Sequence, residues 1–116
     1  MENKDYIYHV VDENCWNQLF AKEHYQHESL GLEGFIHFSY RDQVLWVANK
    51  FYLKNDTLVA FRVEKKLVKN EIKEEFSDGK LFPHLYRSLE VKDIDGYHRL
   101  KKNEAGSFYL DEYISM

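Results

Sequence analysis

The sequence predicts one small domain, spanning residues 1–116, in which short strands are combined with two main helices. A chain of 116 residues lies within the usual size of a single domain and is too short for two ordinary ones. Runs of β-branched and aromatic residues alternate along the chain with two segments of helical periodicity. Hydrophobic residues make up 44% of the chain, which is enough to bury a core and excludes a disordered or collagenous chain.

The N-terminal part predicts a strand followed directly by a helix. Residues Asp5–Val11 contain the β-branched and aromatic run typical of a buried strand. Asp12 can then cap a helix that continues to about Tyr25. Residues 24–34 are polar and glycine-bearing, and they predict a loop with one helical turn near residues 29–32. The apolar stripe of the helix consists of Trp16, Leu19 and Phe20.

The stretch Gly34–Ser39 predicts a short strand, over residues 35–38, with two different faces. Successive side chains of a strand point to opposite sides, so Ile36 and Phe38 are expected to face the core. His37 and Ser39 then point the other way. Polar side chains at the end of a strand, just before a helix, are in a position where binding sites are common.

A second helix is predicted directly after this strand. Ser39 and Asp42 have the spacing of a capping box, which satisfies the free backbone donors of a first helical turn. Apolar residues then recur on one face of the predicted helix. These residues are Val44, Val47, Ala48 and Phe51.

The second half of the chain predicts mainly strands. Leu81–Tyr86 contains Pro83, the only proline of the chain, which lacks the backbone donor that a sheet requires. We therefore expect an edge strand, a strand start or an ordered loop there. The turn Ser77-Asp78-Gly79 precedes it. The other expected strands are Thr57–Val63, Val68–Phe76, Ile94–Leu100 and Gly106–Leu110.

Charge and cysteine content narrow the classes of partner and compartment. The net charge of −4 gives no overall attraction to phosphate backbones, so we do not expect nucleic acid as a partner. Cys15 is the only cysteine, which excludes an intramolecular disulfide and fits a reducing cytoplasm. No stretch has the roughly 18 apolar residues that a membrane span needs. We expect a cytoplasmic protein that binds a small-molecule or nucleotide ligand, and the oligomeric state stays open.

The candidate site consists of polar residues that lie in or beside apolar runs and need partners when buried. Two histidines stand on strands expected to be neighbours, and a Pro-His-x-Tyr segment follows, so one shared cleft is the functional hypothesis. The alternative is that the three histidines are partly buried in unrelated places, each with its own hydrogen bonds. The candidate residues are His9, His37, Ser39, His84 and Tyr86.

Other chemistries fit the sequence less well. No metal is expected, because the histidines lack the spacing of zinc ligands and paired cysteines are absent. Ser39 lacks the flanking glycines of a strained nucleophile elbow. Neither a P-loop nor a dinucleotide-binding Gly-x-Gly-x-x-Gly motif is present. Cys15 borders the stripe of the first helix, where packing is its expected role.

Two sequence blocks, Gly-Phe-Ile-His-x-Ser at 34–39 and Phe-Pro-His-x-Tyr at 82–86, resemble domain of unknown function family 952. The similarity extends to Ile7-Tyr8-His9 and covers about residues 6–110. It implies a compact α+β fold with small mixed or antiparallel sheets and two main helices, related to the ADP-ribosyltransferase superfamily. Members of that superfamily bind nicotinamide adenine dinucleotide (NAD) as substrate in a cleft between two small sheets.

The resemblance also implies roles for the candidate residues. His9 matches the histidine that hydrogen-bonds the adenosine-side ribose, and His37 with Ser39 matches the second motif, which holds the diphosphate or the nicotinamide-side ribose. Glu75 matches the catalytic acidic position, so Glu75 and His37 are the catalytic candidates. His84 and Tyr86 are expected to shape the wall of the cleft. The chain departs from the family pattern at Glu74, where an aromatic residue is usual, and at Arg87, which replaces a glycine.

Two functions from different classes follow. The first is binding of NAD or an ADP-ribose-like ligand with transfer of ADP-ribose, in which Glu75 stabilises positive charge in an oxocarbenium-like transition state. The second is a noncatalytic module that uses the same cleft for a small metabolite, a peptide or a partner protein. A Glu75→Ala variant that loses turnover and keeps binding would favour the enzyme.

Overall fold

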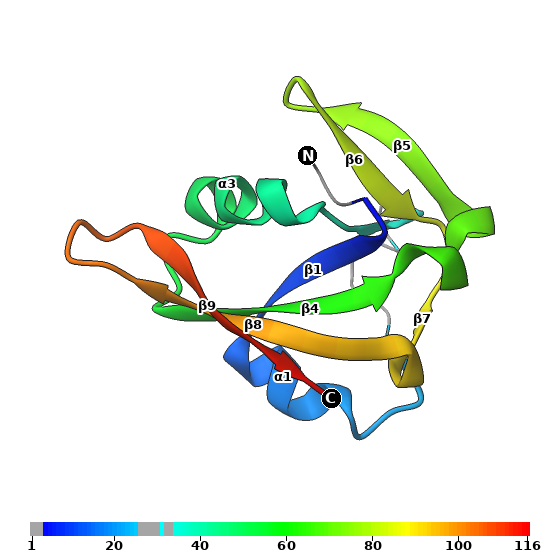
Figure 1. Cartoon of the computed structure of the whole chain (residues 1–116), viewed down its shortest axis with the longest axis horizontal. Helices are drawn as coiled ribbons and strands as arrows, with labels where there is room; N and C mark the ends of the chain where they lie inside the picture. The colour runs from blue at the N-terminus through cyan, green and yellow to red at the C-terminus, as the bar shows by residue number, and fades with distance from the viewer. Residues whose placement is uncertain (1–3, 26–30, 32–33) are drawn as a thin grey trace.

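The computed structural model describes residues 4–25, 31 and 34–116, which form one compact α+β unit. Its centre is a four-stranded antiparallel sheet in the order β1-β4-β8-β9. The described α-helices, α1 (Glu13–Leu19) and α3 (Arg41–Phe51), lie on opposite faces of this sheet (Figure 1). The strands are β1 (Tyr6–Asp12), β4 (Thr57–Glu64), β8 (Ile94–Lys102) and β9 (Phe108–Ser115).

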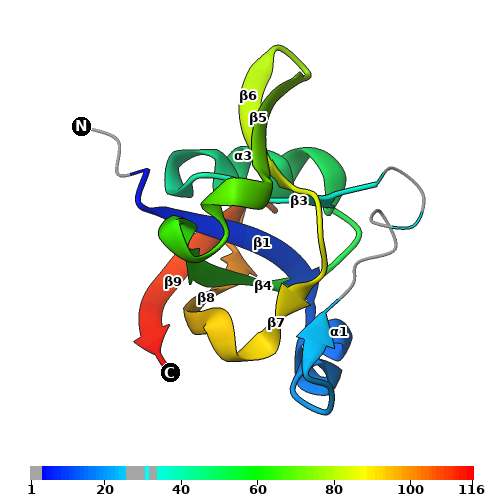
Figure 2. The same cartoon turned by 90° about the vertical axis from the view of Figure 1, so that its right-hand side faces the viewer.

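Two smaller antiparallel sheets complete the fold. The three-stranded sheet has the order β3-β6-β5, and its β5–β6 hairpin projects beyond α3 (Figure 2). A two-stranded sheet pairs β2 (His24–Tyr25) with β7 (Leu89–Glu90). The strands of the three-stranded sheet are β3 (Ile36–His37), β5 (Ile72–Ser77) and β6 (Lys80–Leu85). Three 3₁₀ turns connect these elements: η1 (Lys65–Leu67), η2 (Lys69–Glu71) and η3 (Val91–Asp93).

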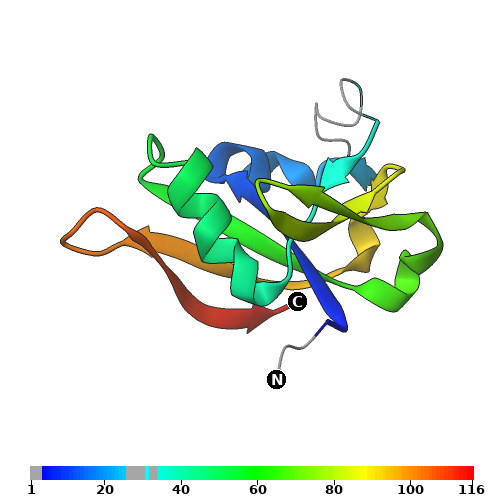
Figure 3. The same cartoon turned by 90° about the horizontal axis from the view of Figure 1, so that it is seen from above.

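The alternation of apolar residues along β1 builds two cores. Ile7 and Val11 face α1 and belong to a cluster that also contains Trp16 and the inner face of the three-stranded sheet. Tyr8 and neighbouring Val10 point the other way and pack with buried residues of α3. Seen from above, α3 crosses over the sheet beside the β5–β6 hairpin (Figure 3). Apolar burial on both faces therefore fixes the position of β1.

A short backbone segment joins the two larger sheets. Phe38 N donates to the Pro83 carbonyl of β6 at 3.1 Å. One residue further on, Ser39 forms an antiparallel bridge with Tyr8 of β1, with N···O distances of 2.7 and 2.8 Å. Between residues 37 and 39 the chain therefore passes from the three-stranded sheet to the edge of the four-stranded sheet.

The first predicted helix begins as expected and ends early. Asp12 is its N-cap, because its Oδ1 accepts a hydrogen bond from Cys15 N at 2.6 Å. The prediction that the helix continues to Tyr25 was wrong: Tyr25 is buried in the core and pairs with Leu89 in the two-stranded sheet. Phe20 of the predicted apolar stripe is 46% exposed. The predicted helical turn near residues 29–32 lies, except for Gly31, outside the described residues.

The second helix starts one residue later than its predicted cap. Tyr40 is the N-cap, and the Gln43 side chain accepts a hydrogen bond from Tyr40 N at 2.9 Å. The Ser39–Asp42 capping box was therefore wrong, because the backbone of Ser39 is already extended and bonded to Tyr8. Within the described part of the chain, no helix is long and apolar enough to cross a membrane.

Pro83 lies in a central strand, which none of the three alternatives for its segment anticipated. β6 pairs with β5 on one side and with β3 on the other. The Pro83 carbonyl faces Phe38, and in an extended strand the nitrogen of the same residue faces the same side. The ladder between β3 and β6 ends at His37, so the missing donor interrupts no pair.

Two strand boundaries also differ from the predictions. β5 begins at Ile72, not at Val68, because residues 65–71 form two 3₁₀ turns that bury Val68 in the core. β9 is longer than predicted and pairs with β8 from residue 108 to residue 115. The predicted turn at Ser77-Asp78-Gly79 is confirmed, with positive φ angles of 52° at Asp78 and 76° at Gly79.

Gly96 of β8 provides a test of the packing between β8 and β9. A Cβ atom at this position would lie 2.0 Å from the Tyr113 hydroxyl oxygen and 2.6 Å from the Ile114 carbonyl oxygen. We expect Gly96→Ala to lower the free energy of unfolding by about 2 kcal/mol, measured by urea denaturation, because the backbone of β9 has to shift. Ser115→Ala, an exposed substitution opposite Gly96, is the control. Equal stability of the two variants would contradict this account.

Candidate functional site

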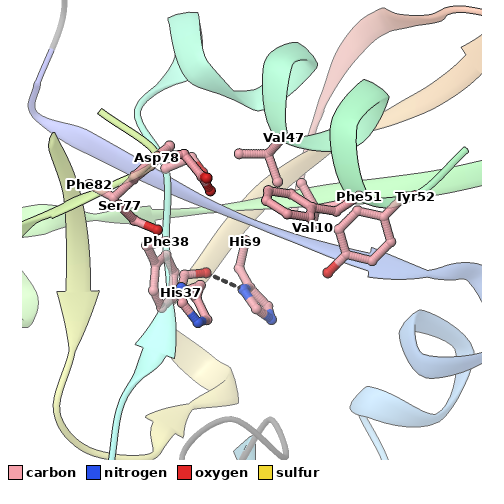
Figure 4. Close-up of a pocket in the computed structure, with 11 residues that line it drawn as sticks. His9, Val10, His37, Phe38, Val47, Phe51, Tyr52, Ser77, Asp78 and Phe82 are labelled. Atoms are coloured by element: carbon pink, nitrogen blue, oxygen red, sulfur yellow. Dashed lines mark hydrogen bonds between the residues drawn. The ribbon is translucent and has the colours of Figure 1, made fainter. Parts of the chain in front are cut away.

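A pocket of about 470 Å³ lies where the two larger sheets meet α3. Its walls come from four separate parts of the chain: β1, the segment after β3, the C-terminal half of α3, and the β5–β6 hairpin (Figure 4). Four aromatic rings contribute to the lining. The lining residues are His9, Val10, His37, Phe38, Ser39, Val47, Phe51, Tyr52, Ser77, Asp78 and Phe82.

His9 is a buried wall residue whose two ring nitrogens are both hydrogen-bonded. Its Nδ1 lies 2.6 Å from the His37 carbonyl oxygen, and its Nε2 lies 2.9 Å from the Tyr25 hydroxyl. A carbonyl oxygen only accepts, so Nδ1 donates, and in the neutral ring Nε2 accepts from Tyr25. The ring also packs against Phe38 and Phe61, with centroids 5.4 Å from each. His9 therefore fixes the backbone of the pocket wall at His37.

Three further groups have pKa values that are raised by burial. Burial raises the pKa values of the Tyr25 and Tyr52 hydroxyls, and also that of the Cys15 thiol. These groups are therefore uncharged at neutral pH. Cys15 packs against the core, in agreement with the packing role expected for it.

A second group of polar residues lies on the outer face of the three-stranded sheet. Glu75 Oε1 accepts a hydrogen bond from the Tyr86 hydroxyl at 2.5 Å and another from His84 Nδ1 at 3.0 Å. The His84 side chain is 4% exposed and the Glu75 side chain 38%. We call Glu75, His84 and Tyr86 the carboxylate cluster.

His37 connects the pocket to the carboxylate cluster. It lines the pocket, and its ring lies edge-on to that of His84 at 4.9 Å between centroids. The five residues of the predicted cleft are thus divided between two adjoining places. His9, His37 and Ser39 line the pocket, whereas His84 and Tyr86 lie with Glu75 beside it.

The two departures from the family pattern point away from the pocket. Glu74 lies on the opposite face of β5, where its Oε2 accepts from the Tyr40 hydroxyl at 2.7 Å and lies 3.3 Å from Lys65 Nζ. Arg87 forms an ion pair with Glu71 at 2.8 Å. Of the adjacent carboxylates at 74 and 75, it is therefore Glu75 that belongs to the histidine-bearing face. Among the described residues, no group of three metal-ligating side chains comes together.

Sequence reasoning missed several residues of the site. Phe35 stacks on His84, with ring centroids 4.1 Å apart and planes 10° apart, and also contacts the His37 ring. Strand alternation places Phe35 on the same face as His37, but an apolar side chain there was not predicted to belong to the site. Tyr52 and Asp78 lie far from the histidines in the sequence, and no local signal places them in the pocket.

Comparison with known proteins identifies the family of this chain. The family model described as "Protein of unknown function (DUF952)" matches residues 10–96, and the chain belongs to this family. No match was found among curated proteins.

Solved structures of protein CC0527 from Caulobacter crescentus share the fold. The crystal structure has a TM-score of 0.80 at 28% identity and covers 90% of this chain and 93% of that chain. Its solution NMR structure has a TM-score of 0.76 at 30% identity, covering 89% of this chain and 90% of that chain.

The carboxylate cluster predicts a shifted titration of Glu75. The hydrogen bond from Tyr86, and then that from His84, hold the pKa of the Glu75 carboxyl below its ordinary value. We expect Tyr86→Phe to raise this pKa, measured by NMR titration of the side-chain carboxyl carbon. Tyr109→Phe, which alters an exposed tyrosine of β9, should leave it unchanged.

The sign of the effect on stability follows from the lowered pKa. A carboxyl group that binds its proton less tightly in the folded state stabilises the fold above its unfolded-state pKa. This contribution is lost as the pH falls through the folded-state pKa. If the pKa of Glu75 is unchanged in the Tyr86→Phe variant, the hydrogen bond from the Tyr86 hydroxyl does not lower that pKa.

Proposed function

We propose that the pocket binds NAD or an ADP-ribose-like ligand and that Glu75 acts on the bound ligand. The observation that carries this proposal is the contact between His37 and His84, which joins a ligand-sized pocket to a hydrogen-bonded carboxylate. Pockets of a few hundred Å³ with aromatic walls and a few polar groups are typical of small-molecule sites. The resemblance to ADP-ribosyltransferases supplies the ligand class.

The proposed reaction breaks the bond between the nicotinamide nitrogen and the ribose C1′ of NAD. The bonding electron pair leaves with the nicotinamide, which becomes neutral, and positive charge develops on the ribose ring. The Glu75 carboxylate stabilises this charge. Water or an acceptor hydroxyl attacks C1′ and releases its proton to solvent.

In this proposal the other residues fix geometry. His9 holds the wall of the pocket through the His37 carbonyl. Because both of its ring nitrogens are hydrogen-bonded within the protein, the hydrogen bond to a ribose that the resemblance implied is not part of this proposal. His37 and Ser39 line the pocket, and His37 contacts His84 of the carboxylate cluster. Tyr86 and His84 keep the Glu75 carboxylate ionised and oriented.

One observation favours the second candidate, a noncatalytic binding module. Glu75 does not line the pocket, and Oε1, one of its two carboxylate oxygens, already accepts two hydrogen bonds. A ligand confined to the pocket would reach His37 without touching Glu75. The same aromatic walls would then serve binding alone.

Calorimetry followed by a turnover assay tests the proposal. We expect NAD to bind the wild-type protein at submillimolar to millimolar concentration and to release nicotinamide slowly. Glu75→Gln should keep binding and reduce nicotinamide release by roughly 100-fold, because it removes the stabilising charge. Glu74→Gln, on the other face of β5, is the matched control.

Each outcome of this experiment is informative. Binding without nicotinamide release in the wild type supports the noncatalytic module. Absence of binding for both NAD and ADP-ribose at millimolar concentration excludes the proposed ligand class. If Glu74→Gln reduces nicotinamide release as much as Glu75→Gln does, Glu75 has no specific catalytic role.

A further inference from the structure

We propose that the pocket selects an organic cation, and that Asp78 is the residue that determines this selectivity. The inference rests on the proposed function only for the identity of the natural ligand. Its own basis is the combination of four aromatic rings with one carboxylate in a single cavity. Aromatic faces attract cations through their negative π-electron density, and sites for quaternary ammonium groups use this arrangement.

The charged residues that line the pocket favour a cation over a phosphate group. Among the residues that the structure describes, no lysine or arginine lines the pocket, and Asp78 is the only lining residue with a fixed charge. A diphosphate placed inside this cavity would meet the Asp78 carboxylate, and the nearby cation Lys50 is already paired with that carboxylate. The cavity therefore suits a cationic or neutral group better than an anionic one.

The backbone at the hairpin tip places Asp78 at the rim of the pocket. Asp78 and Gly79 both have positive φ angles, as the two-residue turn between β5 and β6 requires. The Asp78 carboxylate points toward the side of the pocket where Val47 and Phe51 lie (Figure 4). The turn thus holds a negative charge beside aromatic rings.

The protein itself shows that this place attracts an ammonium group. Lys50 Nζ lies 3.6 Å from Asp78 Oδ1 and 5.8 Å from the centroid of the Phe51 ring. Both partners of this ion pair are more than 40% exposed, so the pair is weak and a ligand can displace Lys50 from Asp78. Lys50 is therefore an internal competitor for a cationic ligand.

The ligand class follows from these contacts. A planar heteroaromatic cation can stack on the aromatic rings and pair with the Asp78 carboxylate. The pyridinium ring of oxidised nicotinamide is such a group. On this basis NAD should bind more tightly than ADP-ribose, which lacks the cation. The diphosphate of NAD would lie outside the pocket.

The experiment uses two probes that differ in charge: N-methylnicotinamide methylated on the ring nitrogen (1-methylnicotinamide), which is a permanent cation, and nicotinamide, its neutral counterpart. We expect the wild-type protein to bind the cation about tenfold more tightly by calorimetry or NMR titration. Asp78→Asn should reduce this preference to about twofold or less. Asparagine tolerates the positive φ of this turn, so the fold is kept.

Substitution of Lys50 should change the affinity for the cation in the opposite direction to Asp78→Asn. Lys50→Met should raise the affinity for N-methylnicotinamide by about threefold, because the competing ammonium group is removed. Lys80→Met makes the same change of net charge and serves as control. Lys80 lies over the Trp46 ring and is not a lining residue of the pocket.

The outcomes separate this inference from the proposed function. Equal affinity for the two probes, or a preference that survives Asp78→Asn, would overturn it even if NAD binds. Binding of N-methylnicotinamide that depends on Asp78 would support it even if NAD does not bind. An equal effect of the Lys50 and Lys80 variants would overturn the role of Lys50 as a competitor.

Discussion

Two backbone hydrogen bonds between Tyr8 and Ser39 determine how the rest of this protein is arranged. They are the bridge through which the three-stranded sheet is attached to the edge of the central sheet. Because residue 38 bonds to β6 and residue 39 to β1, the chain must be extended there and cannot yet begin a helix. The late start of α3, the exposed position of His37 and the cavity between the sheets all follow from this attachment.

The buried His9 contributes both to the packing of the core and to the shape of the pocket. An imidazole in an apolar cluster is costly unless both ring nitrogens have partners. Here one partner is the backbone of residue 37 and the other is Tyr25, a core residue of the short sheet formed with β7. Packing and site geometry are thus parts of one network, so substitutions of His9 are expected to alter both.

Much of the architecture could be predicted from local sequence patterns. The strands at residues 6, 57 and 94, the Asp12 cap and the turn at Asp78 depend on neighbouring residues, and each was found near its expected place. The central position of Pro83, the end of α1 and the separation of Glu75 from the pocket depend on pairing between distant segments. Periodicity within one segment contains no information about such pairing.

The pocket has walls from segments that are distant in the sequence, from His9 to Phe82. No fragment of the chain contains all of them, so the cavity does not exist in the unfolded state. Folding and ligand occupancy are therefore linked equilibria: a ligand that binds only the folded chain adds RT ln(1 + [L]/Kd) to its stability. The concentration of such a ligand would then influence how much of the protein is folded.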